Sequence, residues 1–152
     1  MMAGFAPKDP AYADRVRASF AKQAMMATIG ASLTRVAPGE VDIDLAVSPV
    51  IYQQHGFVHA GAVATAADSA AGYAALSLMP AGAGVLTAEF KINLMAPAAG
   101  ERLIACGRVV KGGRLLTVAQ AEVHAIRSGE RKLVGLLIAT VATVEGRAGV
   151  SD

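Results

Sequence analysis

The chain has 152 residues, which is enough for one domain with a real core and too few for two. Hydrophobic residues make up 54% of it and charged residues only 17%, so we expect each chain to bury part of its surface in an oligomer. The net charge is only +2 and the basic residues are scattered, which excludes the electrostatic footprint of a nucleic-acid-binding protein.

The expected compartment follows from two features of the sequence. Cys106 is the single cysteine, so no disulfide can form within the chain. The first residues lack the basic segment, apolar run and cleavage site of a secretory signal. We therefore expect a cytoplasmic protein.

Residues 1–8 are predicted to form a flexible N-terminal tail. Asp9 and Pro10 then supply an N-cap and the residue favoured at the first helical position, and a helix is predicted from there to about Met26. The first strand is expected over 29–36.

The rest of the chain reads as one long helix, over 60–79, and five more strands. Apolar and polar residues alternate along 41–47 and 87–94, which is the pattern of half-buried strands. Gly112-Gly113 and Ser128-Gly129 separate the last three runs and predict tight antiparallel hairpins. The six strands are predicted over 29–36, 41–47, 87–94, 103–110, 115–126 and 133–144.

The predicted helix over 60–79 contains almost only small and apolar side chains, with Asp68 as its single acid. An ionised carboxylate is costly to bury, and desolvation raises its pKa towards the range in which it can act as a base. Asp68 is therefore the first candidate for catalysis, and the alternative is a structural hydrogen bond to a neighbouring strand. Asp68 and the prevalence of Ala and Gly also argue against a membrane span.

A sheet with only one long helix to cover it must curl around that helix, and small helical side chains let the strands approach closely. The predicted fold is therefore α+β, with one central helix wrapped by a curved antiparallel sheet of five to six strands and an additional N-terminal helix. Residues 9–146 are expected to form this single domain, followed by a C-terminal tail over 147–152.

Three ordered motifs of the chain are QQHGFVHAGAVATAADSAAGYAA, TAEFKINLMAP and GRVVKGGR. Together they resemble the PaaI-type acyl-CoA thioesterases of the hot dog fold, and the resemblance extends from about Ile29 to Val144. It implies an enzyme that hydrolyses the thioester of an aryl- or fatty acyl-CoA to the free acid and CoA. The order of elements predicted above agrees with that fold.

In that family an acidic residue on the central helix is the nucleophile or general base, and the matching position is Asp68. The family's His-Gly-Gly entry to the helix corresponds to His59, Ala60 and Gly61. A backbone N–H at this entry polarises the thioester carbonyl in the family. Such a donor survives the replacement of Gly by Ala where φ is negative.

Two further polar positions match the family. Gln53, six residues before His59, corresponds to an amide residue that is more often Asn. Thr87, at the start of the next strand, matches a Ser or Thr that helps to orient the attacking water. Gln53 and His59 are expected to position the carbonyl and the water.

The spacing of Ala60 and Asp68 predicts a shared site. Eight helical residues span about 12 Å, so one carbonyl cannot contact both positions within one helix. Two antiparallel helices from two subunits would bring the N-terminal amides of one beside Asp68 of the other, which predicts a two-fold homodimer as the minimal active unit. The resemblance implies the same interface and a homotetramer built as a dimer of dimers.

In the expected reaction, the N–H of Ala60 or Gly61 stabilises the negative charge that develops on the carbonyl oxygen. Asp68 of the partner either activates a water or attacks directly to form an anhydride, and the sequence leaves both routes open. Phe57 and Tyr73 are expected around the acyl group.

Basic residues flank the last two predicted turns and are either solvated turn charges or ligands of the CoA phosphates. A glycine in the first turn would allow close backbone approach. The candidates for this part of the substrate site are Lys111, Gly113, Arg114, Arg127 and Lys132.

No metal or cofactor is expected, since coenzyme A is part of the substrate. His55 and His59 are four residues apart, but Gly56 indicates a loop and no third ligand lies nearby in the sequence. His124 is expected at the surface or an interface. Cys106 is expected to be a packed core thiol because no activating group is indicated near it.

Two rival functions on the same fold are weighed against hydrolysis. A non-catalytic acyl-CoA-binding protein would gain nothing from an unpaired buried carboxylate such as Asp68. A hydratase or dehydratase would pair an acid with a His on the central helix, and no His follows Ala60 in this helix.

Overall fold

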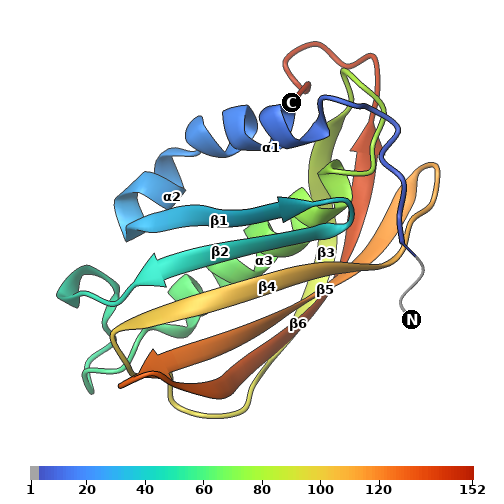
Figure 1. Cartoon of the computed structure of the whole chain (residues 1–152). Helices are drawn as coiled ribbons and strands as arrows, with labels where there is room; N and C mark the ends of the chain where they lie inside the picture. The colour runs from blue at the N-terminus through green and yellow to red at the C-terminus, as the bar shows by residue number, and fades with distance from the viewer. Residues whose placement is uncertain (1–3) are drawn as a thin grey trace.

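The computed structural model describes residues 4–152 and contains one antiparallel sheet that curves around a long helix (Figure 1). The strand order is β1-β2-β4-β5-β6-β3, so β1 and β3 are the two edges of the sheet. This is the predicted hot dog architecture, with six strands and the long helix in the predicted order. The elements are α1 (Tyr12–Ala21), α2 (Ala24–Ile29), β1 (Ala31–Ala37), β2 (Glu40–Ala46), the 3-10 helix η1 (Pro49–Ile51), α3 (Ala60–Leu76), β3 (Gly84–Leu94), β4 (Arg102–Lys111), β5 (Leu116–Arg127) and β6 (Glu130–Val144).

The small side chains of α3 let the sheet lie directly on the helix backbone. A Cβ added to Gly107 of β4 would lie only 2.1 Å from the carbonyl oxygen of Ala70. Along β2, Val41, Ile43 and Leu45 are buried in the core that the sheet forms with α3, while the intervening acids are only half-buried. The period-two pattern of the sequence therefore separates an inner face, towards α3, from an outer face.

The C-terminal end of α3 is capped by a side chain from α1. Arg15 has a side-chain exposure of only 9%, and its guanidinium donates to the carbonyl oxygens of Leu76, Met79 and Pro80. The Leu76 carbonyl also accepts the Met79 N–H, so Arg15 adds to the hydrogen bonds that close the end of α3 and hold the loop after it. This contact also fixes α1 against the end of α3.

The predicted extent of the N-terminal helix is wrong. It divides into α1 and α2 because Gln23 takes an extended conformation, with ψ 100°. The second piece ends at Ile29, where Gly30 adopts the left-handed conformation (φ 74°) that commonly terminates helices. The first strand therefore begins at Ala31, two residues later than predicted.

The structure describes the predicted C-terminal tail and residues 4–8 of the predicted N-terminal tail. Residues 1–3 of the N-terminal tail lie outside the described residues. At the other end, the Asp152 carboxylate accepts hydrogen bonds from the Ser19 hydroxyl (2.6 Å) and the Val85 N–H (3.0 Å). These contacts hold the C-terminal residue against α1 and β3.

Both predicted hairpins are confirmed, since β4 pairs with β5 and β5 with β6 in antiparallel register. Ser128 and Gly129 form the second turn with φ values of 50° and 80°. Positive φ at both central positions is typical of the two-residue turns that match the twist of the flanking strands.

Strand β3 is an edge whose inner face is not fully covered. It pairs only with β6 among the described strands. Phe90 and Leu94 pair with the inner-facing Ala139 and Gly135 of β6, yet they are 44% and 51% exposed. Unpaired backbone beside exposed apolar side chains is a surface suited to strand pairing with another chain.

Candidate functional site

A cavity of about 500 Å³ lies at the N-terminal end of α3. Gln53, Phe57, His59 and Ala60, all predicted site residues, line it together. The cavity can therefore hold an apolar group beside the polar entry to the helix. Its remaining walls are apolar and consist of Val58, Val63, Leu94, Met95, Ala96, Pro97, Ala98 and Val134.

His59 is the N-cap of α3. Its Nδ1 accepts the N–H of Gly61 (2.8 Å), and its carbonyl oxygen accepts the N–H groups of Ala62 (2.9 Å) and Val63 (3.2 Å). Because Nδ1 is an acceptor, the neutral ring carries its proton on Nε2. Within residues 4–152, the Ala60 N–H forms no hydrogen bond. Of the two predicted backbone donors, Ala60 is the one available to a ligand.

The loop before α3 fixes the orientation of Gln53. Its backbone N–H donates to the carbonyl oxygen of Phe57 (2.8 Å), and its Oε1 accepts the N–H of His55. With Oε1 engaged by the loop, the side-chain NH₂ remains as the group that can donate to a ligand.

Asp68 lies two turns further along α3 and is held by β3. Its Oδ1 accepts a hydrogen bond from the Thr87 hydroxyl (2.8 Å). Burial raises the pKa of Asp68, and the hydrogen bond from Thr87 opposes this by favouring the ionised form. Asp68 was predicted to be buried. It is only half-buried, because it lies beside the edge strand. Its Oδ2 forms no hydrogen bond within residues 4–152 and is open to a ligand or water.

The two groups of site residues lie at separate points of one helix. Asp68 and Thr87 do not line the cavity at the helix N-terminus. Ala60 and Asp68 are eight residues apart, about 12 Å along the helix axis. Within one chain, the Ala60 N–H and the Asp68 carboxylate are therefore too far apart to contact the same carbonyl group.

The predicted phosphate-binding residues lie at opposite ends of the domain. Lys111, Gly113 and Arg114 belong to the β4–β5 turn, and the latter two line a second cavity, of about 450 Å³, at the C-terminal end of α3. Arg127 and Lys132 flank the β5–β6 turn, near the end of β6 that reaches the first cavity. None of these four cations forms an ion pair within residues 4–152.

The prediction that Tyr73 contacts the acyl group is wrong. Its hydroxyl accepts a hydrogen bond from the Gln23 amide (2.7 Å) and contacts the Ser19 hydroxyl (3.2 Å). Its ring packs against Phe20 of α1, with the ring centroids 5.9 Å apart. Five helical residues separate Tyr73 from Asp68, so the two side chains leave α3 in directions about 140° apart. Tyr73 attaches α1 to α3.

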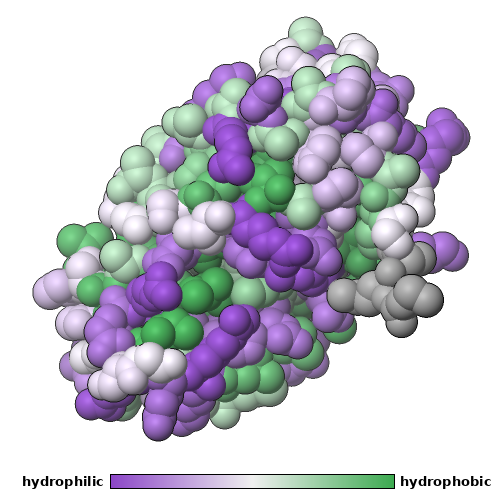
Figure 2. Space-filling view, in the orientation of Figure 1, coloured by the Kyte–Doolittle hydropathy of each residue, from purple (hydrophilic) through white to green (hydrophobic). Residues whose placement is uncertain are grey.

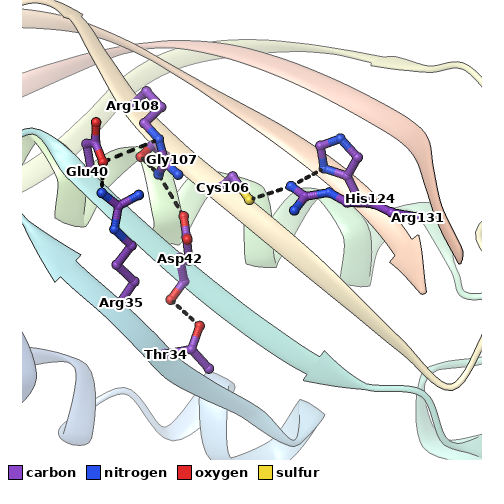
Figure 3. Close-up of polar contacts among 9 residues, drawn as sticks. All are labelled: Thr34, Arg35, Glu40, Asp42, Cys106, Gly107, Arg108, His124 and Arg131. Atoms are coloured by element: carbon purple, nitrogen blue, oxygen red, sulfur yellow. Dashed lines mark hydrogen bonds and ion pairs between the residues drawn. The ribbon is translucent and has the colours of Figure 1, made fainter. Parts of the chain in front are cut away.

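Cys106 and His124 lie on the outer face of the sheet (Figure 3). The Arg131 guanidinium donates to Cys106 Sγ (3.2 Å) and contacts His124 Nδ1 (3.1 Å). Burial raises the pKa of the Cys106 thiol, and burial together with Arg131 lowers the pKa of His124. Cys106 was predicted to be a core thiol. It is buried, but it lies outside the core around α3 because its neighbour Gly107 takes the inner position on β4.

The same outer face carries a network of ion pairs. Arg108 pairs with Asp42 (2.7 Å) and also approaches Glu40, which in turn pairs with Arg35 (Figure 3). Figure 2 shows hydrophilic side chains interspersed with apolar ones on the face of the sheet seen in Figure 1. These charges satisfy one another across β1, β2 and β4 and are remote from both halves of the candidate site.

Two further properties concern the described part of the chain as a whole. Among residues 4–152, no group of three or more His, Cys, Asp or Glu side chains could hold a metal ion. No helix in that range is long and apolar enough to cross a membrane.

Met95 was expected to shape the acyl pocket and does line the first cavity, while its neighbours Leu94, Ala96 and Pro97 were not predicted to line it. All three lie at or just after the end of a strand that the alternation predicted correctly. Their order in the sequence does not indicate that this strand end returns to the start of α3, because that depends on the curvature of the sheet.

Comparison with known proteins identifies relatives of the chain. Residues 55–131 match the family model of the thioesterase superfamily. The chain is similar to a solved thioesterase family protein from Silicibacter pomeroyi, with 49% identity over 89% of this chain and 99% of that chain and a TM-score of 0.87. No curated protein matches the sequence.

Two more distant structures share the fold. One is the E. coli PaaI protein from the phenylacetic acid degradation operon, at 21% identity over 89% of this chain and 94% of that chain, with a TM-score of 0.79. The other is a thioesterase from Haemophilus influenzae, at 16% identity over 86% and 90% of the two chains, with a TM-score of 0.78.

Proposed function

We propose that this chain, which belongs to the thioesterase superfamily and is a thioester hydrolase, acts on acyl-CoA at a site shared by two subunits. The products are the free acid and CoA. The observation that carries this proposal is the Asp68 carboxylate, which Thr87 orients and partial burial makes more basic. A cytoplasmic location, where acyl-CoA esters are available, belongs to the same proposal.

The first half of the site polarises the thioester carbonyl. The Ala60 N–H, at the positive end of the α3 dipole, donates to the carbonyl oxygen and stabilises the charge that develops on it. The Gln53 NH₂ group is the second donor. His59 acts mainly as a positioning residue, since its Nδ1 caps the Gly61 N–H and so fixes the start of the helix.

The second half of the site comes from the partner subunit. Asp68 of that subunit either removes a proton from water as it attacks the carbonyl carbon, or attacks itself to form an anhydride that water opens. In both routes the thiolate of CoA leaves and takes up a proton. Thr87 holds one carboxylate oxygen, so the other faces the substrate or the water.

The two halves meet if β3 pairs with β3 of the partner about a two-fold axis. The exposed inner face of β3, with Phe90 and Leu94, then packs against the partner. The two α3 helices run antiparallel, so that each Asp68 lies beside the other subunit's Ala60. A homotetramer would further bury the apolar outer-face residues Leu86, Leu116, Val118 and Ile138, which are 37–54% exposed.

The same two-fold arrangement gathers the basic turns. Because the two helices are antiparallel, the N-terminal end of one α3 lies on the same side of the site as the C-terminal end of the partner's α3. Arg127 and Lys132 of one subunit thus lie on the same side of the site as Lys111 and Arg114 of the other. These turns, with Gly113, are proposed to hold the phosphates of CoA.

The apolar cavity at the start of α3 is proposed to hold the acyl group, with Phe57 in its wall. The eight wall residues other than Gln53, Phe57, His59 and Ala60 are all apolar, which favours an uncharged aryl or fatty acyl group. The order and spacing of the site residues support a PaaI-type enzyme.

A thiol-release assay over a panel of aryl and fatty acyl-CoA esters tests this function. We expect turnover of at least one class, and we expect Asp68→Asn to lower kcat by about 10²- to 10⁴-fold because the base or nucleophile is lost. Circular dichroism and the melting temperature show whether the variant is folded. Absence of turnover across the panel, or full activity of Asp68→Asn, would contradict the proposal.

A further inference from the structure

The second cavity, which we name the rear cavity, lies at the C-terminal end of α3. In Figure 1 the N-terminal segment passes beside the loop after α3 and near the β4–β5 turn, and these three segments enclose the cavity. Its volume is about 450 Å³. Its lining consists of Phe5, Ala6, Lys8, Ala75, Leu78, Met79, Pro80, Gly112, Gly113, Arg114, Thr117 and Thr143.

The rear cavity combines apolar walls with a polar group that lacks a partner. Thr117 points to the inner face of β5 and is only 4% exposed. Its hydroxyl forms no hydrogen bond within residues 4–152 and is not one of the fully buried polar atoms that lack a partner, so solvent reaches it from the cavity. The hydroxyl of Thr117 is therefore available to a molecule that occupies the cavity.

The rim of the rear cavity is cationic. Lys8 and Arg114 both line it, and neither forms an ion pair within residues 4–152. Gly112 also belongs to the lining, and a Cβ added there would meet no atom within 4 Å. An anionic group can thus approach the backbone of the β4–β5 turn between two cations.

The rear cavity and the Asp68 carboxylate lie on the same side of α3. Asp68, Gly72 and Ala75 are spaced by four and three residues and so lie along one side of the helix. Ala75 lines the rear cavity, and the space where Gly72 would carry a Cβ is empty to 4 Å. The distance along the helix from Asp68 to Ala75 is about 10 Å, which the pantetheine arm of CoA can span.

We propose that the rear cavity holds the nucleotide end of CoA, and that the N-terminal segment completes this subsite. The adenine lies against Phe5, Met79 and Pro80, and its polar edge bonds with the Thr117 hydroxyl. Lys8 and Arg114 hold the phosphates at the rim. This inference rests on the proposed acyl-CoA thioesterase function and adds Lys8, Phe5 and Thr117 to the substrate site.

Two variants test the subsite. Gly112→Leu places a bulky apolar side chain at the lining of the cavity, where a Cβ meets no atom within 4 Å, and Lys8→Ala removes one cation. Gly4→Leu and Lys22→Ala are matched controls, because both residues are exposed and do not line the cavity. All five proteins are titrated with adenosine 3′-phosphate 5′-diphosphate and assayed with an acyl-CoA and the corresponding acyl-pantetheine.

We expect the wild-type protein and both controls to bind the nucleotide, and Gly112→Leu and Lys8→Ala to bind it at least about tenfold more weakly. KM for acyl-CoA rises similarly in these two variants, while kcat and the kinetics with acyl-pantetheine do not change. Failure of the wild type to bind the nucleotide, or equal binding by Gly112→Leu, overturns the subsite. Failure to hydrolyse either thioester overturns the proposed function instead.

Discussion

The contact between Asp68 and Thr87 determines how the proposed site responds to pH. Burial raises the pKa of Asp68, and the hydrogen bond from the Thr87 hydroxyl opposes this rise. A base must be ionised to act. The rate should therefore fall when the pH drops through the pKa of Asp68.

Thr87→Val tests this balance at the level of one hydroxyl. The change removes the hydrogen bond that favours ionised Asp68, so the pKa of the carboxyl rises and the acidic limb of the kcat profile moves to higher pH. Thr87→Ser keeps the hydroxyl and serves as the control, with a limb close to that of the wild type. A uniform loss of rate at every pH, without movement of the limb, would assign Thr87 a structural role only.

At the scale of elements, β4 approaches α3 closely at Gly107. A Cβ on Gly107 would lie 2.1 Å from the Ala70 carbonyl oxygen, which belongs to backbone and cannot move aside easily. Such contact forces the strand away from the helix. The small-residue composition of α3 is thus needed for packing, independently of the chemistry of Asp68.

Gly107→Ala should lower the free energy of unfolding by at least about 2 kcal/mol, the range of overpacked cores. Gly135→Ala is the matched control on β6, since its Cβ would meet Val63 at an ordinary 3.5 Å. That control should change stability by less than about 0.5 kcal/mol. Urea denaturation measures both, and equal stability of the two variants would refute the close-approach argument.

The elements were predictable to different degrees. Alternation along 41–47 and 87–94 gave the strands, because a sheet with one covered face needs that period. The break between α1 and α2 was not predictable, since Gln23 is a residue that helices accept and its amide is held by Tyr73 through tertiary contact. The misassigned role of Tyr73 has the same origin, because spacing alone did not show that α1 covers it.

The candidate site was predictable where the motif fixes local geometry. His59 caps α3 through a contact only two residues away, and Asp68 follows at a fixed helical distance. The apolar walls from Leu94 to Pro97 depend on how the whole sheet curves, and the sequence carries no local sign of this. The sequence alone did not show which N–H is free to bind the carbonyl. In the structure the Gly61 N–H donates to the His59 side chain, which leaves the Ala60 N–H.

At the scale of the whole molecule, the exposed inner face of β3 is expected to be the dimer interface. Phe90→Lys puts a charge into that interface and should shift the protein towards monomer, with loss of activity at the same protein concentration. Val50→Lys is the matched control, since Val50 is 74% exposed and lies outside β3. Sedimentation velocity measures the assembly, and a fully active Phe90→Lys monomer would argue against a shared site.

The most direct test of the central claim, that two subunits share each active site, mixes two inactive variants. The first variant, Asp68→Asn, lacks the second half of the site. The second variant combines Gln53→Ala with Ala60→Pro and lacks the first half, because proline has no backbone N–H. Circular dichroism of each variant, purified alone, shows whether it is folded. The two chains are then co-expressed with different tags, and the heterodimer is purified through both.

A shared site gives such a heterodimer one intact site and one doubly damaged site. We expect its kcat to recover to about half of the wild-type value per dimer, since one of two symmetric sites is complete. Recovery to this level with either tag arrangement would support the claim. A heterodimer as inactive as its two parents would contradict it, because every site would then need both halves from one chain.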